Sequence, residues 1–140
     1  MVISHRNSEE CRAVTNQTES DAGWDDGLVP GVIGRTVEPH HECPVEVALE
    51  AVKGRWTTLV LRDLMHGVRT YSALSQGLPK LSDKVLVDVL AHLRKQGLVC
   101  RTVVRGYPNR TLYGMTADGW KLRPLLVELY RTGERLRQRP

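Results

Sequence analysis

The chain has 140 residues and a formal net charge of +4, which suits one domain that buries a core without disulfide bonds. No apolar run approaches the ~20 residues needed to span a bilayer, and the polar N-terminus lacks the apolar core of a signal peptide. These features argue against a membrane partner, and we expect a cytoplasmic protein.

The charge is unevenly distributed along the chain. Residues 1–42 contain three basic and eight acidic residues, a net charge of −5, whereas residues 43–140 contain 17 basic and eight acidic residues, a net charge of +9. A basic domain of this size indicates a polyanionic partner such as nucleic acid, although a merely solubilised surface would have the same composition.

Residues 1–42 show no sustained hydrophobic period. They are rich in Ser, Thr, Asn, Gly and acidic residues, and Pro and Gly interrupt their last third. This composition predicts a flexible acidic tail, followed by an ordered domain at 43–140.

The cysteines do not form a metal or disulfide pattern. Cys11, Cys43 and Cys100 are widely spaced and include no Cys-x-x-Cys pair. The ligand-type side chains of "HHEC" at 40–43 are consecutive, so they cannot all point at one ion in regular structure. We expect no metal site and no cofactor, with Cys100 buried in a strand and Cys11 in the tail.

Three amphipathic helices are expected between Cys43 and Gly77. Pro44 suits the first position of the first helix, Gly67 ends the second, and Thr70 is the N-cap of the third. Their apolar spacing predicts that the second and third helices bury Trp56, Leu59, Val60, Leu64, Tyr71 and Leu74.

A fourth helix is predicted between its N-cap Ser82 and its stop Gly97. At 100° per residue, one face carries Leu86, Val89, Leu90 and Leu93, and the other carries Lys84, Val87, Asp88 and Ala91. The apolar face predicts core packing. The short side chains of the other face suit a helix lying in a major groove, although an ordinary solvated face has the same pattern.

Two β-type runs and a last helix follow. "LVCRTVV" and "RTLYGMT" are joined by the turn-rich "RGYPNR", and Thr116 caps a helix that Pro124 is expected to kink. The fold class is therefore mainly α (α+β), a winged helix-turn-helix with a two-stranded β-hairpin wing.

This arrangement predicts a DNA-binding surface. The N-terminal turn of the fourth helix would face base edges or hold a phosphate, and the wing arginines would contact the adjacent minor groove. Asp88 would accept a hydrogen bond from cytosine or simply pair with Lys84. The candidate DNA-binding residues are Thr70, Ser82, Asp83, Lys84, Val87, Asp88, Ala91, Arg105, Asn109 and Arg110.

Three segments resemble the HxlR family of winged-helix transcriptional regulators. They are "CPVEVALEAVKGRWTTLVLRDLMHG", "YSALSQGLPKLSDKVLVDVLAHLRKQGLVCRT" and "YPNRTLYGMTADGWKLRPLL", and the likeness extends from Cys43 to about Arg135. Val87 and Ala91 depart from the family pattern, because hydroxyl and long polar side chains are common there, which favours apolar contact with thymine methyl groups.

The resemblance implies a regulator, often a repressor, that binds two related half-sites as a homodimer. It implies that the first and last helices dimerise through Val45, Leu49, Leu122, Leu125, Leu126 and Leu129. It also makes Cys43 a candidate redox or electrophile sensor, since a cysteine at this position is the sensor in several members. The helix N-terminus at Cys43 favours a thiolate, whereas Glu42 and Glu46 oppose it.

Two other readings come from different functional classes. The regulator could respond to a small-molecule effector without cysteine chemistry, in a pocket at the dimer helices lined by Trp56, Tyr71, Trp120 and Tyr130. An enzyme is not expected, and we assign no catalytic residue, because the sequence shows no paired carboxylates, glycine-rich phosphate loop or nucleophile–base set.

Overall fold

The computed structural model describes residue 28 and residues 38–138. Contacts within the chain separate residues up to Val47 from a compact unit that begins at Ala48, so the two parts are described separately. Most of the expected acidic tail, including Cys11, lies outside the described residues. Among the helices of the described part, none has the length and apolar character needed to cross a membrane.

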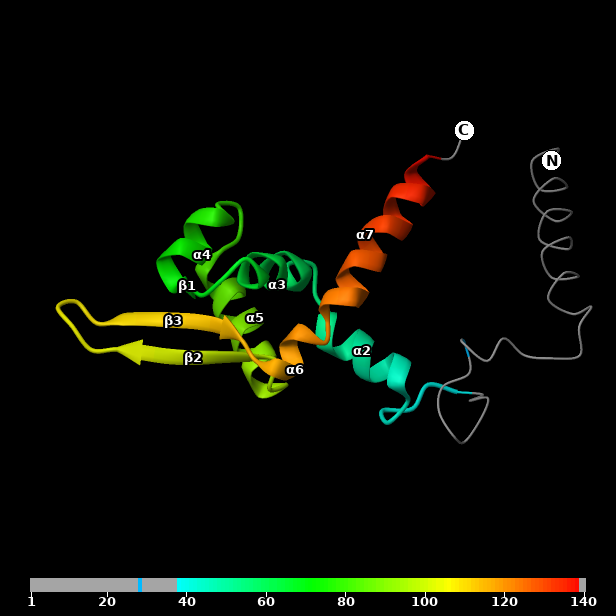
Figure 1. The fold of residues 1–140 in the computed structure, drawn as a ribbon, viewed down its shortest axis with the longest axis horizontal. Coiled ribbons are helices and arrows are strands. Elements are labelled where there is room, and N and C mark those ends of the chain that lie inside the picture. Colours follow the sequence, from blue (N-terminus) through cyan, green and yellow to red (C-terminus); the bar gives the residue numbers. More distant parts are fainter. Residues whose placement is uncertain (1–27, 29–37, 139–140) are drawn as a thin grey trace, which may run out of the picture. The chain divides into compact units, whose positions relative to one another are not determined.

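The fold is built mainly from short helices with one small sheet (Figure 1). In chain order the elements are α2 (Pro44–Val52), α3 (Thr57–Met65), β1 (Arg69–Thr70), α4 (Tyr71–Gly77), α5 (Asp83–Lys95), β2 (Val99–Val104), β3 (Arg110–Met115), α6 (Ala117–Trp120) and α7 (Arg123–Arg137). The order of four helices, a hairpin and C-terminal helices agrees with the winged helix-turn-helix prediction.

Local signals define the ends of these helices. The side chains of Thr70, Ser82 and Thr116 cap α4, α5 and α6 by accepting hydrogen bonds from the third backbone N–H that follows. Gly97 ends α5 with φ of +73°, a left-handed conformation that glycine adopts without steric cost. The caps and stops predicted from the sequence are therefore confirmed.

The sheet has three strands, not the two expected. Its order is β1-β3-β2, both pairs are antiparallel, and the short β1 pairs Arg69 with Tyr113 and Thr70 with Leu112. A strand of two residues has too few positions to show an alternating pattern, so the sequence does not reveal it. Its effect is to join the start of α4 directly to the hairpin.

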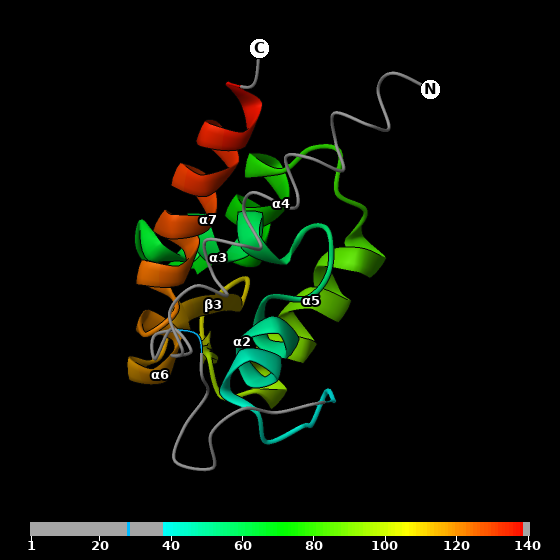
Figure 2. The ribbon, with the colours of Figure 1, turned by 90° about the vertical axis from the view of Figure 1, so that its right-hand side faces the viewer.

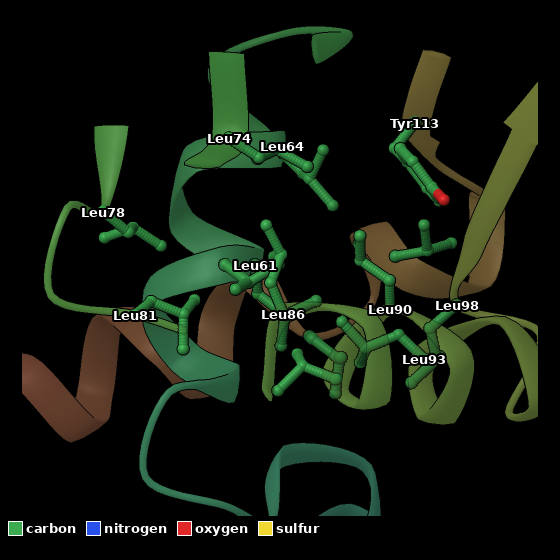
Figure 3. Packing of buried hydrophobic residues seen from close by; sticks show 14 of the residues in the cluster. Leu61, Leu64, Leu74, Leu78, Leu81, Leu86, Leu90, Leu93, Leu98 and Tyr113 are labelled. Atoms are coloured by element: carbon green, nitrogen blue, oxygen red, sulfur yellow. The ribbon is translucent and has the colours of Figure 1, made fainter. Parts of the chain in front are cut away.

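The core lies between α3, α4, α5 and the base of the hairpin (Figure 3). Val60, Leu64 and Leu74 are buried as expected, together with all four residues of the predicted apolar face of α5. Trp56, Leu59 and Tyr71 are only partly buried, which corrects the expectation for these three residues. Leu61, which is not on the predicted buried face, is also fully buried. Neighbouring elements therefore cover more of the circumference of α3 than the predicted face alone.

Cys100 is exposed, and the expectation that it is buried is wrong. Successive side chains of a strand point to opposite faces, so the burial of Val99 turns Cys100 to the other face of the sheet. There its cross-strand partner is Gly114, which has no side chain to cover the thiol.

The C-terminal region is two helices, not one kinked helix. α6 lies at the base of the hairpin in both views (Figures 1 and 2), and Lys121 and Leu122 separate it from α7. Pro124 stands in the first turn of α7, where its missing N–H costs no helical hydrogen bond. The proline therefore helps to start a second helix.

Candidate nucleic-acid interface

α4 and α5 form a helix-turn-helix whose turn is held by local hydrogen bonds. The N–H of Leu81 donates to the carbonyl of Leu78 at 3.0 Å, and both leucines are buried. Because these two side chains anchor the turn in the core, the direction of α5 is set by packing rather than by a free loop.

The two faces of α5 differ completely in exposure. Leu86, Leu90 and Leu93 are at most 2% exposed, whereas Val87 on the opposite face is 53% exposed. The outer face consists of the candidate residues Lys84, Val87, Asp88 and Ala91, all of them exposed. The structure thus leaves one continuous face of this helix available to a partner.

The first turn of α5 is fixed by two side chains. The Ser82 hydroxyl accepts from the N–H of Val85 at 3.3 Å, and the Tyr71 hydroxyl donates to the Asp83 carboxylate at 3.1 Å. Burial and this hydrogen bond together raise the pKa of Tyr71 above its ordinary value. Asp83 therefore ties α4 to the N-terminus of α5, a role that its sequence position does not reveal.

The hairpin exposes its basic residues. Every residue from Cys100 to Arg110 is exposed, including Arg101, Arg105 and Arg110, and the hairpin extends beyond the helices (Figure 1). At its tip the Gly106 N–H donates to the Asn109 side-chain oxygen at 3.0 Å, so Asn109 shapes the turn. The neighbouring Tyr107 is fully exposed.

The basic groups of this surface carry uncompensated charge. In the described part of the chain, no carboxylate lies within 4.0 Å of the cationic groups of Lys84, Arg101, Arg105 or Arg110. Lys84 and Asp88 do not form the ion pair considered as an alternative. We call the outer face of α5 together with these three arginines the basic surface. It offers a helix and a ribbon to a polyanion.

A polar contact also joins α5 to α2. The His92 ring nitrogen Nε2 lies 2.9 Å from the backbone carbonyl oxygen of Glu50. Lys53, which directly follows α2, lowers the pKa of the Glu50 carboxyl through its hydrogen bond and its charge. His92 therefore acts as a link between helices on the flank of the basic surface.

Cys43 is half-buried and directly precedes α2, so the thiol stands at a helix start as expected. The three residues before it are exposed, and ligand atoms of His40, His41 and Glu42 lie within 4.8 Å of one another. The Nδ1 atom of His40 already accepts from the N–H of Glu42 at 3.2 Å. Because Nδ1 is used in this hydrogen bond, only the Nε2 atom of His40 could bind a metal ion.

The residues expected at a dimer interface fall into two groups. Val45, Leu49 and Leu129 are exposed, and Leu125 and Leu126 are half-buried. Leu122 is 8% exposed and belongs to the domain's own core, because it precedes the first turn of α7 where that helix still contacts the other elements. Its side chain is therefore used mainly in the packing of the domain itself, and its expected place at a dimer interface stays a prediction.

Comparisons with known proteins agree with this geometry. The profile of the HxlR-like helix-turn-helix family matches residues 51–139. The chain is 36% identical over 91 residues to the uncharacterised HTH-type transcriptional regulator YkvN of Bacillus subtilis, covering 65% of this chain and 77% of YkvN.

Two solved structures show the same fold. The crystal structure of the HTH-type transcriptional regulator YtcD is 29% identical, with a TM-score of 0.64, covering 69% of this chain and 98% of that one. The redox regulator HypR in its oxidised form is 26% identical, with a TM-score of 0.61, covering 66% of this chain and 95% of HypR.

Proposed function

The chain belongs to the HxlR-like helix-turn-helix family of DNA-binding transcriptional regulators, and on this premise we propose that it represses transcription as a homodimer on a two-half-site operator. Such a regulator would act in the cytoplasm, where the operator lies. The basic surface is the single observation that carries the proposal, because it combines an exposed helix face with arginines on a ribbon that have no carboxylate partner among the described residues.

In this proposal α5 enters the major groove with its first turns toward the base edges. Lys84 would contact guanine or phosphate, and Asp88 would accept from a cytosine amino group. Val87 and Ala91 offer no hydrogen bond, so they would contact thymine methyl groups. Asp83 and Thr70 would act by positioning, because their side chains already hold α5 and α4.

The wing would contact the next minor groove or its phosphates. Arg105 and Arg110 flank the tip of the hairpin, and Arg101 stands farther back on β2. Arginines inserted in a minor groove or placed on phosphates contribute affinity more than sequence choice. Asn109 supports the turn that presents them.

A dimer is supported by the surface of α7. This helix of 15 residues has no buried residue, although Leu129 and Leu136 continue the apolar face that starts at Leu125. An amphipathic helix that leaves its apolar face exposed is typical of an interaction surface. Val45 and Leu49 form a second exposed apolar surface, on α2.

The proposal is tested by genome-wide footprinting of the purified full chain, followed by fluorescence anisotropy on the fragments that it selects. We expect protected sites that contain two related half-sites, bound by a dimer. Failure to protect any fragment above the level of random DNA would contradict the operator-binding proposal.

A second proposal concerns Cys43. The thiol is accessible at a helix start, and the chain resembles HypR, which is a redox regulator. We propose that oxidation or alkylation of Cys43 changes operator affinity. Because Cys100 is exposed as well, it is a second target for the same reagents.

The two cysteines can be separated by substitution. Diamide or a quinone should change the operator affinity of the wild type and of Cys100→Ser, and leave Cys43→Ser unaffected. A response that persists in Cys43→Ser and disappears in Cys100→Ser would assign sensing to the wing instead.

A further inference from the structure

A pocket of about 320 Å³ lies between α5 and the hairpin. Its volume is at the lower end of the roughly 300–1,000 Å³ range of small-molecule sites. It is lined by Tyr71, Val87, Leu90, Ala91, Arg94, Arg101, Thr111 and Tyr113. Of the four aromatic residues expected around an effector, the pocket includes only Tyr71.

The helix side of the pocket is apolar for most of its length. Val87, Leu90, Ala91 and Arg94 follow the spacing i, i+3, i+4, i+7, so they form one stripe along α5. The first three side chains have no hydrogen-bonding group. The stripe therefore offers an apolar surface that ends at the guanidinium group of Arg94.

The sheet side adds a second guanidinium group and an aromatic ring. Arg101 and Tyr113 are direct cross-strand partners, so their side chains lie on the same face of the hairpin. Tyr113 is mostly buried, and it points from β3 toward the helix that carries Leu90 (Figure 3). The face of the hairpin that packs on the core at Tyr113 therefore also lines the pocket, through Tyr113 and Arg101.

The polar groups around the pocket are available to a ligand. Neither Arg94 nor Arg101 has a carboxylate partner within 4.0 Å among the described residues. The Tyr113 hydroxyl forms no hydrogen bond with the described side chains or backbone. Because the described residues include no side-chain polar atom that is both buried and without a hydrogen bond, this hydroxyl is in contact with solvent. The pocket accordingly combines positive charge with an unused hydroxyl group.

We propose that this pocket binds a small aromatic carboxylate and that the bound ligand competes with DNA for α5. Arginine pairs with a carboxylate through two parallel hydrogen bonds and stacks on aromatic rings. The apolar stripe and the tyrosines would hold the ring of the ligand. Val87 and Ala91 belong both to the pocket and to the basic surface, so the competition clause rests on the proposed DNA-binding function.

The site is tested on the full chain without DNA, so the result does not depend on operator binding. 2-Naphthoate is titrated by calorimetry and by amide chemical shifts. We expect saturable binding with shifts concentrated around Ala91 and Thr111, and affinity for neutral 2-naphthamide weaker by about tenfold because it lacks the charge. Inorganic phosphate, which has no ring, should bind more weakly than 2-naphthoate.

Substitutions locate the binding. Arg94→Gln should weaken 2-naphthoate by about fivefold or more, since it removes one charge-assisted pair. Ala91→Leu should weaken 2-naphthoate binding, because the larger side chain would fill part of the pocket. The control Lys95→Gln removes the same charge from the next residue, which does not line the pocket, and should have no effect.

The outcomes separate the two parts of the proposal. Absence of saturable binding, equal affinity for the amide or for phosphate, or equal effects of Arg94→Gln and Lys95→Gln would overturn the aromatic carboxylate site. In anisotropy, 2-naphthoate should raise the apparent Kd for operator DNA. Binding that leaves DNA affinity unchanged at saturation would overturn the competition clause alone.

Discussion

At the scale of single residues, the outer face of α5 presents few groups that can read a base. Val87 and Ala91 are exposed, but their side chains cannot form hydrogen bonds. Lys84 and Asp88 do not form an ion pair with each other, so both are available to DNA. Sequence preference should therefore depend on Lys84 and Asp88 for polar contacts and on thymine methyl groups for apolar ones.

Lys84→Ala should weaken operator binding by roughly tenfold, because a direct contact to guanine or phosphate is worth about 1–3 kcal/mol. Fluorescence anisotropy measures the affinity, and thermal unfolding shows whether the domain is intact. The matched control is Lys95→Ala, which removes the same side chain from the far end of the same helix. An equal loss of operator affinity in the two variants would mean that the N-terminal turn of α5 is not the part that contacts the DNA bases.

Some polar residues chosen from the sequence have a structural role first. Asp83 was expected at DNA, but its carboxylate accepts from Tyr71 on the preceding helix, and Asn109 accepts from Gly106 within the turn. These contacts join residues through turns whose geometry the sequence does not specify. For that reason a sequence can nominate such residues for the surface without showing what holds them.

At the scale of elements, α6 is packed more tightly than any pattern predicts. A Cβ atom added at Gly119 would lie 2.1 Å from the backbone oxygen of Leu98 and 2.6 Å from the Met115 side chain. The first neighbour is backbone and cannot move aside. Gly119 therefore lets α6 approach the start of β2.

Gly119→Ala should lower the free energy of unfolding by about 2 kcal/mol or more, since overpacking at a rigid contact forces the backbone to shift. Denaturant unfolding monitored by circular dichroism measures the change. The control Gly133→Ala has open space around its added methyl group and should not destabilise the domain. An unfolding free energy unchanged by Gly119→Ala would show that α6 is free to separate from the hairpin.

The exposed face of α7 has a consequence for assembly. Leu129 is 48% exposed, so replacing it does not open a cavity in the subunit. Leu129→Glu should shift the protein toward monomer in analytical ultracentrifugation while its secondary structure stays intact, because a charge would be buried without a partner at the interface. The control Arg123→Glu places a negative charge at an exposed position on the far side of α7 from this apolar face and should leave the dimer unchanged. A dimer that resists Leu129→Glu must use another surface.

The helices were predictable because periodicity and caps are local signals. The apolar face of α5, its cap Ser82 and its stop Gly97 all occur where the sequence indicated. The errors concern tertiary context. The two-residue β1 depends on a distant strand, and the exposure of Cys100 depends on the glycine opposite.

At the scale of the whole molecule, the charge of residues 43–140 and the exposed arginines of the hairpin support one electrostatic account. A domain that neutralises phosphates releases counterions, so its affinity for DNA must fall steeply with salt. Two exposed arginines, Arg105 and Arg110, should account for part of that slope in each subunit.

The salt dependence of operator affinity, measured by anisotropy for the wild type and for the Arg105→Ala/Arg110→Ala variant, tests this account most directly. We predict a log–log slope of about −4 or steeper for the wild type, from several phosphate contacts, and a slope shallower by about one for each lost contact in the variant. A wild-type slope near zero, or an identical slope in both proteins, would contradict the DNA-binding role assigned to the basic surface.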